Sequence, residues 1–216
     1  MRAIQAVIFD LDDTLLKTAE IKWAHHKAVA AHYGIELTDE VLARYWGMPF
    51  EVMIGHLYNH ADTVKNMLAA NRALEAQFPK AIQEDTLDVL GTLARHHIVT
   101  GVVTSLTTDY ARKDLALARV PSDAFLFVQG ADATAYHKPD GRVFDPALAR
   151  LGASAIQRSQ VLYVGDALMD HQAATGASLQ FVGVATGFVR VEQFKEAGAP
   201  AIGRLGELPA YLGLVA

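Results

Sequence analysis

The chain of 216 residues contains no cysteine, and this absence excludes several kinds of site. Disulfide bonds, zinc–thiolate centres and cysteine nucleophiles all require a thiol. Long hydrophobic runs are missing as well, since no apolar stretch approaches the roughly 20 residues of a membrane-spanning helix. The N-terminal residues also lack the apolar segment of a signal peptide. We therefore expect a soluble cytoplasmic protein without a membrane partner.

Positive charge is scarce: 19 Lys and Arg stand against 24 Asp and Glu, which gives a formal net charge of −5. This balance argues against nucleic acid as a partner, because nucleic-acid-binding surfaces are usually basic. It leaves anionic substrates possible, because a bound divalent cation can reverse the local field. Hydrophobic residues make up 51% of the chain, so we expect a packed core. The composition does not indicate an oligomeric state.

Strand and helix patterns alternate along most of the chain. Apolar or β-branched runs predict strands at 6–9, 97–105, 125–128, 161–164 and 180–184, with helical patterns between them. Residues 15 to about 80 instead show helical spacing with no strand signal. We therefore predict an α/β protein with a doubly wound parallel Rossmann-like sheet in residues 1–14 and 82–216, and an inserted helical cap in residues 15–81.

The first predicted strand ends abruptly in acidic residues. Asp10 and Asp12 lie two residues apart, so an extended backbone would point both carboxylates to the same side. Buried carboxylates are costly unless a cation or a proton compensates them. Open parallel sheets place their ligand sites at this end of the strands. The alternative is an acidic surface turn, which the segment alone does not exclude.

Further polar residues follow the other predicted strands: Thr104 and Ser105, Lys138, and Asp166 with Asp170. In a parallel sheet these groups converge on one edge. Several hard oxygen ligands favour magnesium over zinc. Magnesium, a lysine and hydroxyl groups can neutralise a phosphoryl group, while one carboxylate attacks phosphorus and another transfers a proton.

The order of these segments resembles the four motifs of the haloacid dehalogenase superfamily. They are Asp-Leu-Asp-Asp-Thr at 10–14, Val-Val-Thr-Ser at 102–105, Lys-Pro at 138–139 and Gly-Asp-x-x-x-Asp at 165–170. The resemblance implies that Asp10 is the nucleophile and Asp12 the general acid and base. It also implies that Thr104, Ser105 and Lys138 bind the phosphoryl group. Magnesium would be held by Asp10, the Asp12 carbonyl and Asp166, with Asp170 as an outer ligand.

The helical insertion resembles the cap of the branch that contains phosphoglycolate phosphatases and β-phosphoglucomutases. Within it, Gly47-Met48-Pro49 resembles the loop that selects the substrate, so Trp46, Gly47 and Met48 are candidate substrate contacts. Lys17 and Lys22 are candidate contacts for a second anionic group on the substrate.

We therefore expect a magnesium-dependent phosphatase that hydrolyses a small phosphorylated metabolite through an aspartyl-phosphate. One alternative is a mutase that transfers the phosphoryl group between sugar positions. This is disfavoured because Lys22 replaces the histidine that similar mutases carry after Thr-Ala-Glu. Another alternative is a silent binding protein of the same fold, which the complete set of Asp10, Asp12, Lys138 and Asp166 argues against.

Overall fold

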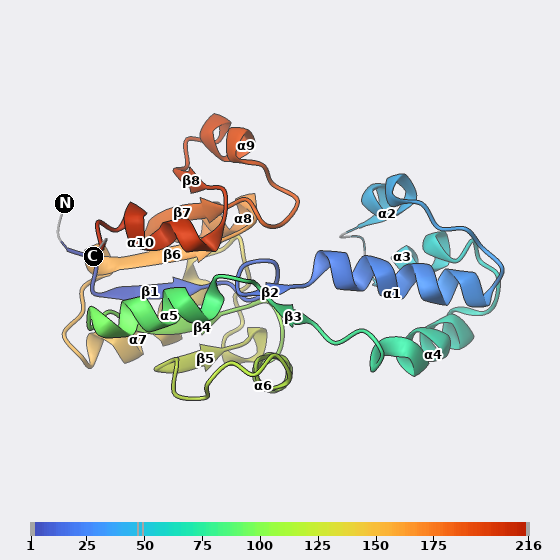
Figure 1. The fold of residues 1–216 in the computed structure, drawn as a ribbon, viewed down its shortest axis with the longest axis horizontal. Helices are drawn as coiled ribbons and strands as arrows, with labels where there is room; N and C mark the ends of the chain where they lie inside the picture. The colour runs from blue at the N-terminus through green and yellow to red at the C-terminus, as the bar shows by residue number, and fades with distance from the viewer. Residues whose placement is uncertain (1–2, 47, 49, 215–216) are drawn as a thin grey trace. The chain divides into compact units, whose positions relative to one another are not determined.

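The computed structural model describes residues 3–46, 48 and 50–214. Gly47, one of the predicted substrate contacts, lies outside these residues. The chain divides into two compact units, Met1–Lys17 with Ile82–Ala216, and Thr18–Ala81 (Figure 1). We call them the sheet unit and the helical unit. The sequence placed the first boundary after residue 14, three residues earlier than this division.

The sheet unit is built on six parallel strands in the order β5-β4-β1-β6-β7-β8. The predicted α/β class and doubly wound parallel sheet are confirmed. The strands are β1 (Ala6–Phe9), β4 (Val99–Val103), β5 (Phe127–Gln129), β6 (Val161–Gly165), β7 (Gln180–Val184) and β8 (Ala201–Ile202). Because β1 pairs with β4 on one side and β6 on the other, residues that follow β1 emerge in the middle of the sheet.

Successive residues of β1 enter two different cores, as the two-residue repeat of a strand requires. Val7 and Phe9 face a core shared with α5 (Thr86–Arg95), α6 (Thr108–Leu117) and α10 (Leu208–Tyr211). Ala6 and Ile8 face a core shared with α7 (Asp145–Gly152), α8 (Leu168–Gly176) and α9 (Val191–Glu196). Helices therefore cover both faces, which explains why β1 is apolar throughout.

Short elements complete the sheet unit. Four 3-10 helices occur among the described residues: η1 (Ala131–Ala133), η2 (Gly141–Phe144), η3 (Arg158–Gln160) and η4 (Leu205–Glu207). Two short strands, β2 (Leu16–Lys17) and β3 (Ala81–Ile82), pair where the chain leaves this unit and returns. The prediction that residues 15 to 80 contain no strand is therefore wrong for β2. A two-residue strand is too short to produce a periodic pattern.

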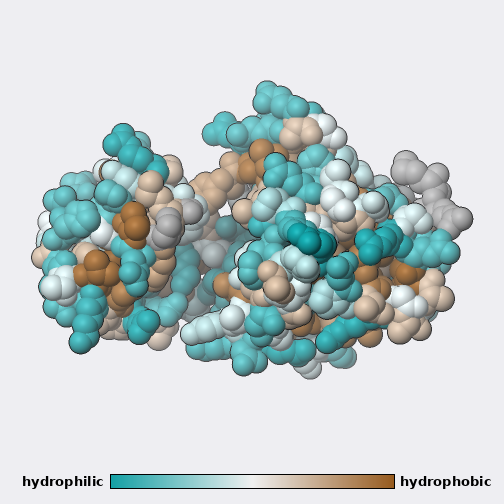
Figure 2. Space-filling view, turned by 180° about the vertical axis from the view of Figure 1, so that it is seen from behind, coloured by the Kyte–Doolittle hydropathy of each residue, from teal (hydrophilic) through white to brown (hydrophobic). Residues whose placement is uncertain are grey.

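The helical unit consists of α1 (Ala19–His32), α2 (Asp39–Tyr45), α3 (Phe50–Leu57) and α4 (Val64–Glu75). Its own hydrophobic core contains Val29, Leu42, Ile54, Leu57 and Met67, all at most 1% exposed. The helical character predicted for the insertion is confirmed. No described helix is both long and apolar enough to span a membrane. Figure 2 shows mainly hydrophilic residues on the viewed face, with scattered hydrophobic ones, as is usual for a protein surface.

A buried polar network joins α1, α4 and Tyr58, the residue that follows α3. His26 Nδ1 lies 2.7 Å from the Tyr58 hydroxyl, which accepts a hydrogen bond from the Asn71 side-chain amide at 2.8 Å. His25 Nε2 lies 2.9 Å from the Asn71 carbonyl oxygen. Since the tyrosine oxygen already accepts from Asn71, its hydrogen is available to His26, which is then neutral. Burial lowers the pKa of His26 to about 4, and the charges of His25 and Lys22 add to the effect.

We predict that acidification destabilises the helical unit. The pKa of His26 in the folded protein lies below the usual value of 6.5. The neutral histidine therefore contributes fully to the free energy of unfolding above pH 6.5, and this contribution is lost as the pH falls toward 4. Going from pH 7 to pH 5 should therefore cost about 2 kcal/mol. Both tryptophans of the chain, Trp23 and Trp46, belong to this unit. Urea unfolding followed by tryptophan fluorescence measures the loss.

The His26→Gln variant should unfold with much less dependence on pH over this range. The His32→Gln variant is the matched control, because His32 is an exposed histidine on the same helix. Equal pH dependence in wild type and His26→Gln would contradict the assignment.

Candidate active site

Asp10 is the first residue after β1, at the centre of the sheet edge. Its backbone N–H donates to the Val164 carbonyl oxygen at 2.8 Å, which continues the pairing of β1 with β6. The residue is only 7% exposed. The hydrophobic strand thus carries a carboxylate to a position where water solvates it poorly.

Asp166 and Asp170 come from the adjoining strand and helix. Asp166 follows β6 directly, and Asp170 lies in the first turn of α8. The Asp170 carboxylate accepts a hydrogen bond from the Ala167 N–H at 3.0 Å, a favourable arrangement at a helix N-terminus. A Cβ atom at Gly165 would lie 2.5 Å from the Asp170 Oδ2 atom. Glycine at the end of β6 is therefore needed for the Asp170 carboxylate to lie against the strand.

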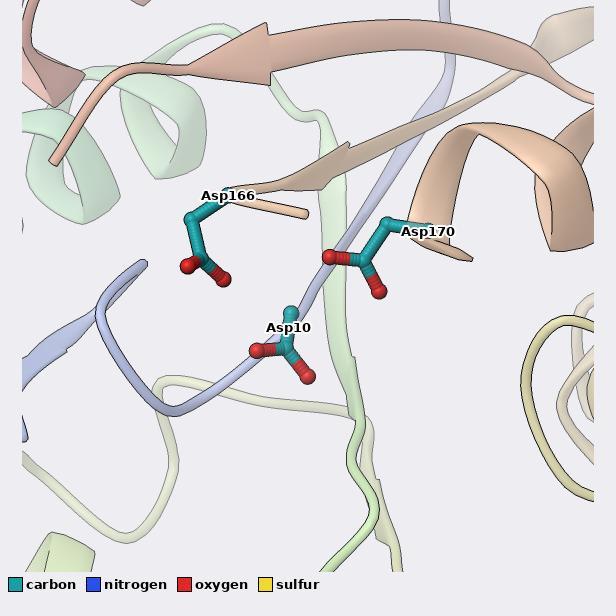
Figure 3. Close-up of side chains that lie close together, drawn as sticks. All are labelled: Asp10, Asp166 and Asp170. Carbon is teal, nitrogen blue, oxygen red and sulfur yellow. The ribbon is translucent and has the colours of Figure 1, made fainter. Parts of the chain in front are cut away.

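The three carboxylates converge, as Figure 3 shows. One oxygen from each of Asp10, Asp166 and Asp170 lies within 4.8 Å of the others. Lys138 reaches this group from the loop after β5. Its ammonium lies 2.5 Å from Asp10 Oδ1 and 2.8 Å from Asp170 Oδ1, with 3% of the side chain exposed. The structure thus brings together four residues from three separate segments of the chain.

One ammonium faces three carboxylates, and the pKa values reflect this imbalance. Burial raises the pKa of Asp10 to about 7; Lys138 opposes the rise, whereas Asp170 and Asp12 add to it. Burial and the charges of Asp10 and Asp170 raise the pKa of Asp166 to about 9. Burial alone would lower the pKa of Lys138, but its two carboxylate partners keep the ammonium charged.

This arrangement fits a hard divalent cation. Carboxylate oxygens are the donors that such cations prefer. A cation would also bring positive charge next to Asp166, which forms no ion pair with another described residue, whereas the Lys138 ammonium is paired with Asp10 and Asp170. Asp12 is half-buried and is not a member of the group within 4.8 Å.

The predicted hydroxyl residues follow β4, the strand beside β1. Thr104 is 2% exposed, and its N–H donates to the Gln129 carbonyl oxygen at 3.0 Å. Its hydroxyl accepts from the Leu106 N–H at 3.2 Å. Ser105 is exposed. These residues begin the loop one strand away from Asp10.

The candidate substrate contacts have partners within their own units. The Lys17 ammonium lies 3.2 Å from Glu84 Oε1, and the Lys22 ammonium lies 2.9 Å from Glu75 Oε1. The ring of Trp46 meets Trp23 and His26 edge-on, at centroid distances of 6.1 and 6.0 Å, and belongs to the periphery of the helical core. Met48 is 43% exposed. Their contact with a substrate stays a prediction.

Sequence reasoning missed Tyr163 in β6. Its hydroxyl donates toward Asp170 Oδ1 and the Val103 carbonyl oxygen, each at 3.2 Å. The Lys138 ammonium lies 5.3 Å from the centre of its ring. Tyr163 therefore supports both members of the Lys138–Asp170 pair. The sequence offers no signal for this role, because a tyrosine inside an apolar strand has the pattern of an ordinary core residue.

Residues 7–184 match the model of the family described as haloacid dehalogenase-like hydrolase. The chain belongs to this family. The match spans the strand before Asp10, the lysine loop and the strand beyond Asp170, so it contains every group described above. The family resemblance predicted from the motifs is confirmed, and with it the assignment of the chain as a hydrolase.

Named relatives of this hydrolase include phosphatases. A protein of Caldanaerobacter subterraneus with the provisional name pyrophosphatase PpaX is 29% identical over 197 residues, covering 89% of this chain and 87% of the relative. A phosphoglycolate phosphatase of Yersinia pestis is 26% identical over 197 residues, covering 87% and 83%. The crystal structure of a provisional β-phosphoglucomutase from Thermotoga maritima has a TM-score of 0.85 at 21% identity, covering 99% and 100%. This last likeness concerns the fold.

We predict opposite effects on stability from two changes in the carboxylate group. Lys138→Met leaves Asp10 and Asp170 without their cation and should destabilise the metal-free protein by about 3 kcal/mol. Asp166→Asn removes a carboxylate whose raised pKa makes ionisation costly, and should stabilise it by about 1 kcal/mol at pH 8. Urea unfolding followed by circular dichroism in the presence of a chelator measures both.

The sign for Asp166 follows from its raised pKa. Its folded state holds a proton that the unfolded state releases near pH 4, so the ionisation penalty grows as the pH rises from about 4 to about 9. The gain from Asp166→Asn should therefore shrink at pH 5. A lower free energy of unfolding for Asp166→Asn than for wild type at pH 8 would contradict the inference that negative charge is in excess at this site.

Proposed function

We propose that this hydrolase is a magnesium-dependent phosphatase that cleaves a small phosphate monoester through an aspartyl-phosphate. The observation that carries the proposal is the buried Lys138 ammonium between Asp10 and Asp170, with Asp166 beside them. A carboxylate paired with a buried ammonium at the centre of a sheet edge, beside donors that fit a divalent cation, is suited to attack an anionic group once that cation is bound.

The proposed reaction has two steps. An oxygen of Asp10 attacks phosphorus, and the bond to the ester oxygen breaks. Asp12 gives its proton to the departing oxygen and becomes a carboxylate. Asp12 then takes a proton from water, whose oxygen attacks the phosphorus of the aspartyl-phosphate. This second step releases phosphate, regenerates Asp10 and returns the proton to Asp12.

Magnesium fits the donor set: we assign its ligands to Asp10, Asp166 and the Asp12 main-chain carbonyl, with Asp170 in an outer position. Bound there, it would neutralise charge on the phosphoryl oxygens. Lys138 contributes a fixed positive charge beside the attacking carboxylate. Thr104, with the backbone at Ser105, would donate hydrogen bonds to phosphoryl oxygens. The raised pKa of Asp166 supports the need for a cation at this position.

The substrate we propose is a small phosphorylated metabolite in the cytoplasm. Relatives named pyrophosphatase and phosphoglycolate phosphatase support a compact anionic substrate. Lys17 and Lys22 are the candidate contacts for a second anionic group, and each would exchange its glutamate partner for the substrate. Trp46 and Met48 complete the proposed contacts, with Gly47.

A mutase is the weaker candidate. Lys22 occupies the position where similar mutases carry a histidine, and its ammonium is paired with Glu75 at 2.9 Å. An ammonium has no lone pair with which to accept a proton, whereas transfer between two hydroxyl groups requires a group that readily accepts and gives protons.

We predict that the purified protein releases phosphate from at least one of pyrophosphate, phosphoglycolate and a set of sugar phosphates, and that chelation stops the release. Asp10→Asn should reduce turnover to background, because an amide is a poor nucleophile. Asp12→Asn should lower kcat by roughly 10²- to 10⁴-fold, the usual contribution of a general acid or base. Phosphate is measured colorimetrically.

Asp145→Asn is the control for these substitutions, because it alters an exposed aspartate of the sheet unit whose Arg158 partner lies 3.7 Å away. It should retain wild-type turnover. No phosphate release from any ester by the folded, magnesium-loaded protein would refute the phosphatase, and isomerisation of a sugar phosphate without release would favour the mutase. Full activity in Asp10→Asn would exclude the aspartyl-phosphate.

A further inference from the structure

Lys138 is a buried charge on a largely exposed loop. Between β5 and η2, most described side chains face solvent, yet the Lys138 side chain is 3% exposed and meets two carboxylates. Exposed loops sample many conformations, and ordering each backbone residue costs roughly 1–2 kcal/mol. The short distances at Lys138 therefore require something to hold the loop.

The two ends of the loop are joined first. Gln129, the last residue of β5, donates from its side-chain amide to the Val143 carbonyl oxygen at 2.6 Å, and both residues are buried. Within the loop, the Asp140 N–H donates to the His137 carbonyl oxygen at 2.8 Å. These bonds close the base of the loop and the turn that contains Lys138.

A second closure uses side chains on either side of the lysine. The Arg142 guanidinium donates from Nε to Asp140 Oδ1 at 3.0 Å and from Nη2 to Asp140 Oδ2 at 2.6 Å. The same guanidinium lies 3.9 Å from the centre of the Tyr136 ring. Residue 136, before the lysine, is thereby tied to residue 142, after it. We call Tyr136, Asp140 and Arg142 the loop clamp.

The residue between the two charged members of the clamp fixes the loop to α8. A Cβ atom at Gly141 would lie 2.4 Å from the Ala177 nitrogen and 2.4 Å from the Gly176 carbonyl carbon. Only glycine allows this approach of η2 to the end of α8. Since the first turn of α8 carries Asp170, the loop and one carboxylate partner of Lys138 rest on the same helix.

We propose that the loop clamp positions the Lys138 ammonium between Asp10 and Asp170. Tyr136 and Arg142 are positioning residues, because their contacts described above lie within the clamp and they act on Asp10 and Asp170 through the lysine. The expected effect on turnover rests on the phosphatase proposed above, whereas the expected effect on the lysine itself does not. An exposed Arg–Asp pair contributes little to global stability, so its loss should loosen the loop without unfolding the protein.

The test measures the reactivity of Lys138 directly. Wild type, Arg142→Ala and Tyr136→Ala are treated briefly with N-hydroxysuccinimidyl acetate, and modification of each lysine is followed by mass spectrometry. Exposed Lys113 serves as the internal standard. We expect labelling of Lys138 relative to Lys113 to rise by about fivefold or more in both variants. We also expect kcat to fall by about tenfold with little change in KM, as for a small displacement of a catalytic group.

Two matched controls separate positioning from a general effect. Arg204→Ala removes a similarly exposed arginine, whose Nη1 lies 3.1 Å from Asp85 Oδ2 in a different part of the sheet unit. Tyr136→Phe keeps the ring beneath Arg142. Both should label like wild type, and the urea midpoint of Arg142→Ala should match that of Arg204→Ala.

Unchanged labelling of Lys138 in Arg142→Ala and Tyr136→Ala would overturn the clamp, whatever happens to turnover. Equal increases in Arg204→Ala would do the same, because the effect would not be local. If labelling rises as expected but wild type releases no phosphate from any ester, the clamp stands and the phosphatase fails.

Discussion

The buried ion pairs of Lys138 are the contacts on which the arrangement of the site depends. They join the loop after β5 to the end of β1 and the first turn of α8, which are distant in sequence. Buried charges tolerate little displacement, because a separated ion inside the protein loses both its partner and its solvent. The parallel sheet sets where the carboxylates emerge, and the ammonium holds them together against their mutual repulsion. Tyr163 and the glycines at 141 and 165 are the local features that make this close packing possible.

The excess of negative charge at this site determines which ligands it can bind. The Lys138 ammonium pairs with two carboxylates. Asp166 adds a third carboxylate, and the described contacts include no second cationic side chain for it. Such a group favours protons or a cation when it stands alone. A further anion, such as the phosphate ester proposed as substrate, would be repelled by such a group unless protons or a cation compensate the charge. The net charge of the chain alone gives no hint of this local preference.

Much of this arrangement was predictable, because strands and their ends leave strong signals. The apolar residues before Asp10 and Asp166 mark central parallel strands, and the edge where these strands end is where ligands bind. Other features have no such signal. β8 has two residues, which are too few to show the alternating hydrophobic pattern of a strand. Tyr163 has the pattern of a core residue, because its role arises from contacts with segments that one sequence does not pair. Arg142 has the pattern of a solvated loop residue, because its role depends on how the loop folds around Lys138. The ion pairs of Lys17 and Lys22 also depend on glutamates more than 50 positions away.

The pairing of β2 with β3 has a consequence for how this chain can change over evolutionary time. It brings Leu16–Lys17 beside Ala81–Ile82, and the Gln83 N–H and the Thr86 hydroxyl both donate to the Leu15 carbonyl oxygen. The sixty-odd residues between these strands therefore form an insertion whose two ends are held together. The entropic cost of closing such a loop rises only slowly with its length. Insertions, deletions and repacking in the helical unit can accumulate there without shifting the register of the sheet. One catalytic scaffold can in this way acquire new specificities while its reactive groups stay where they are.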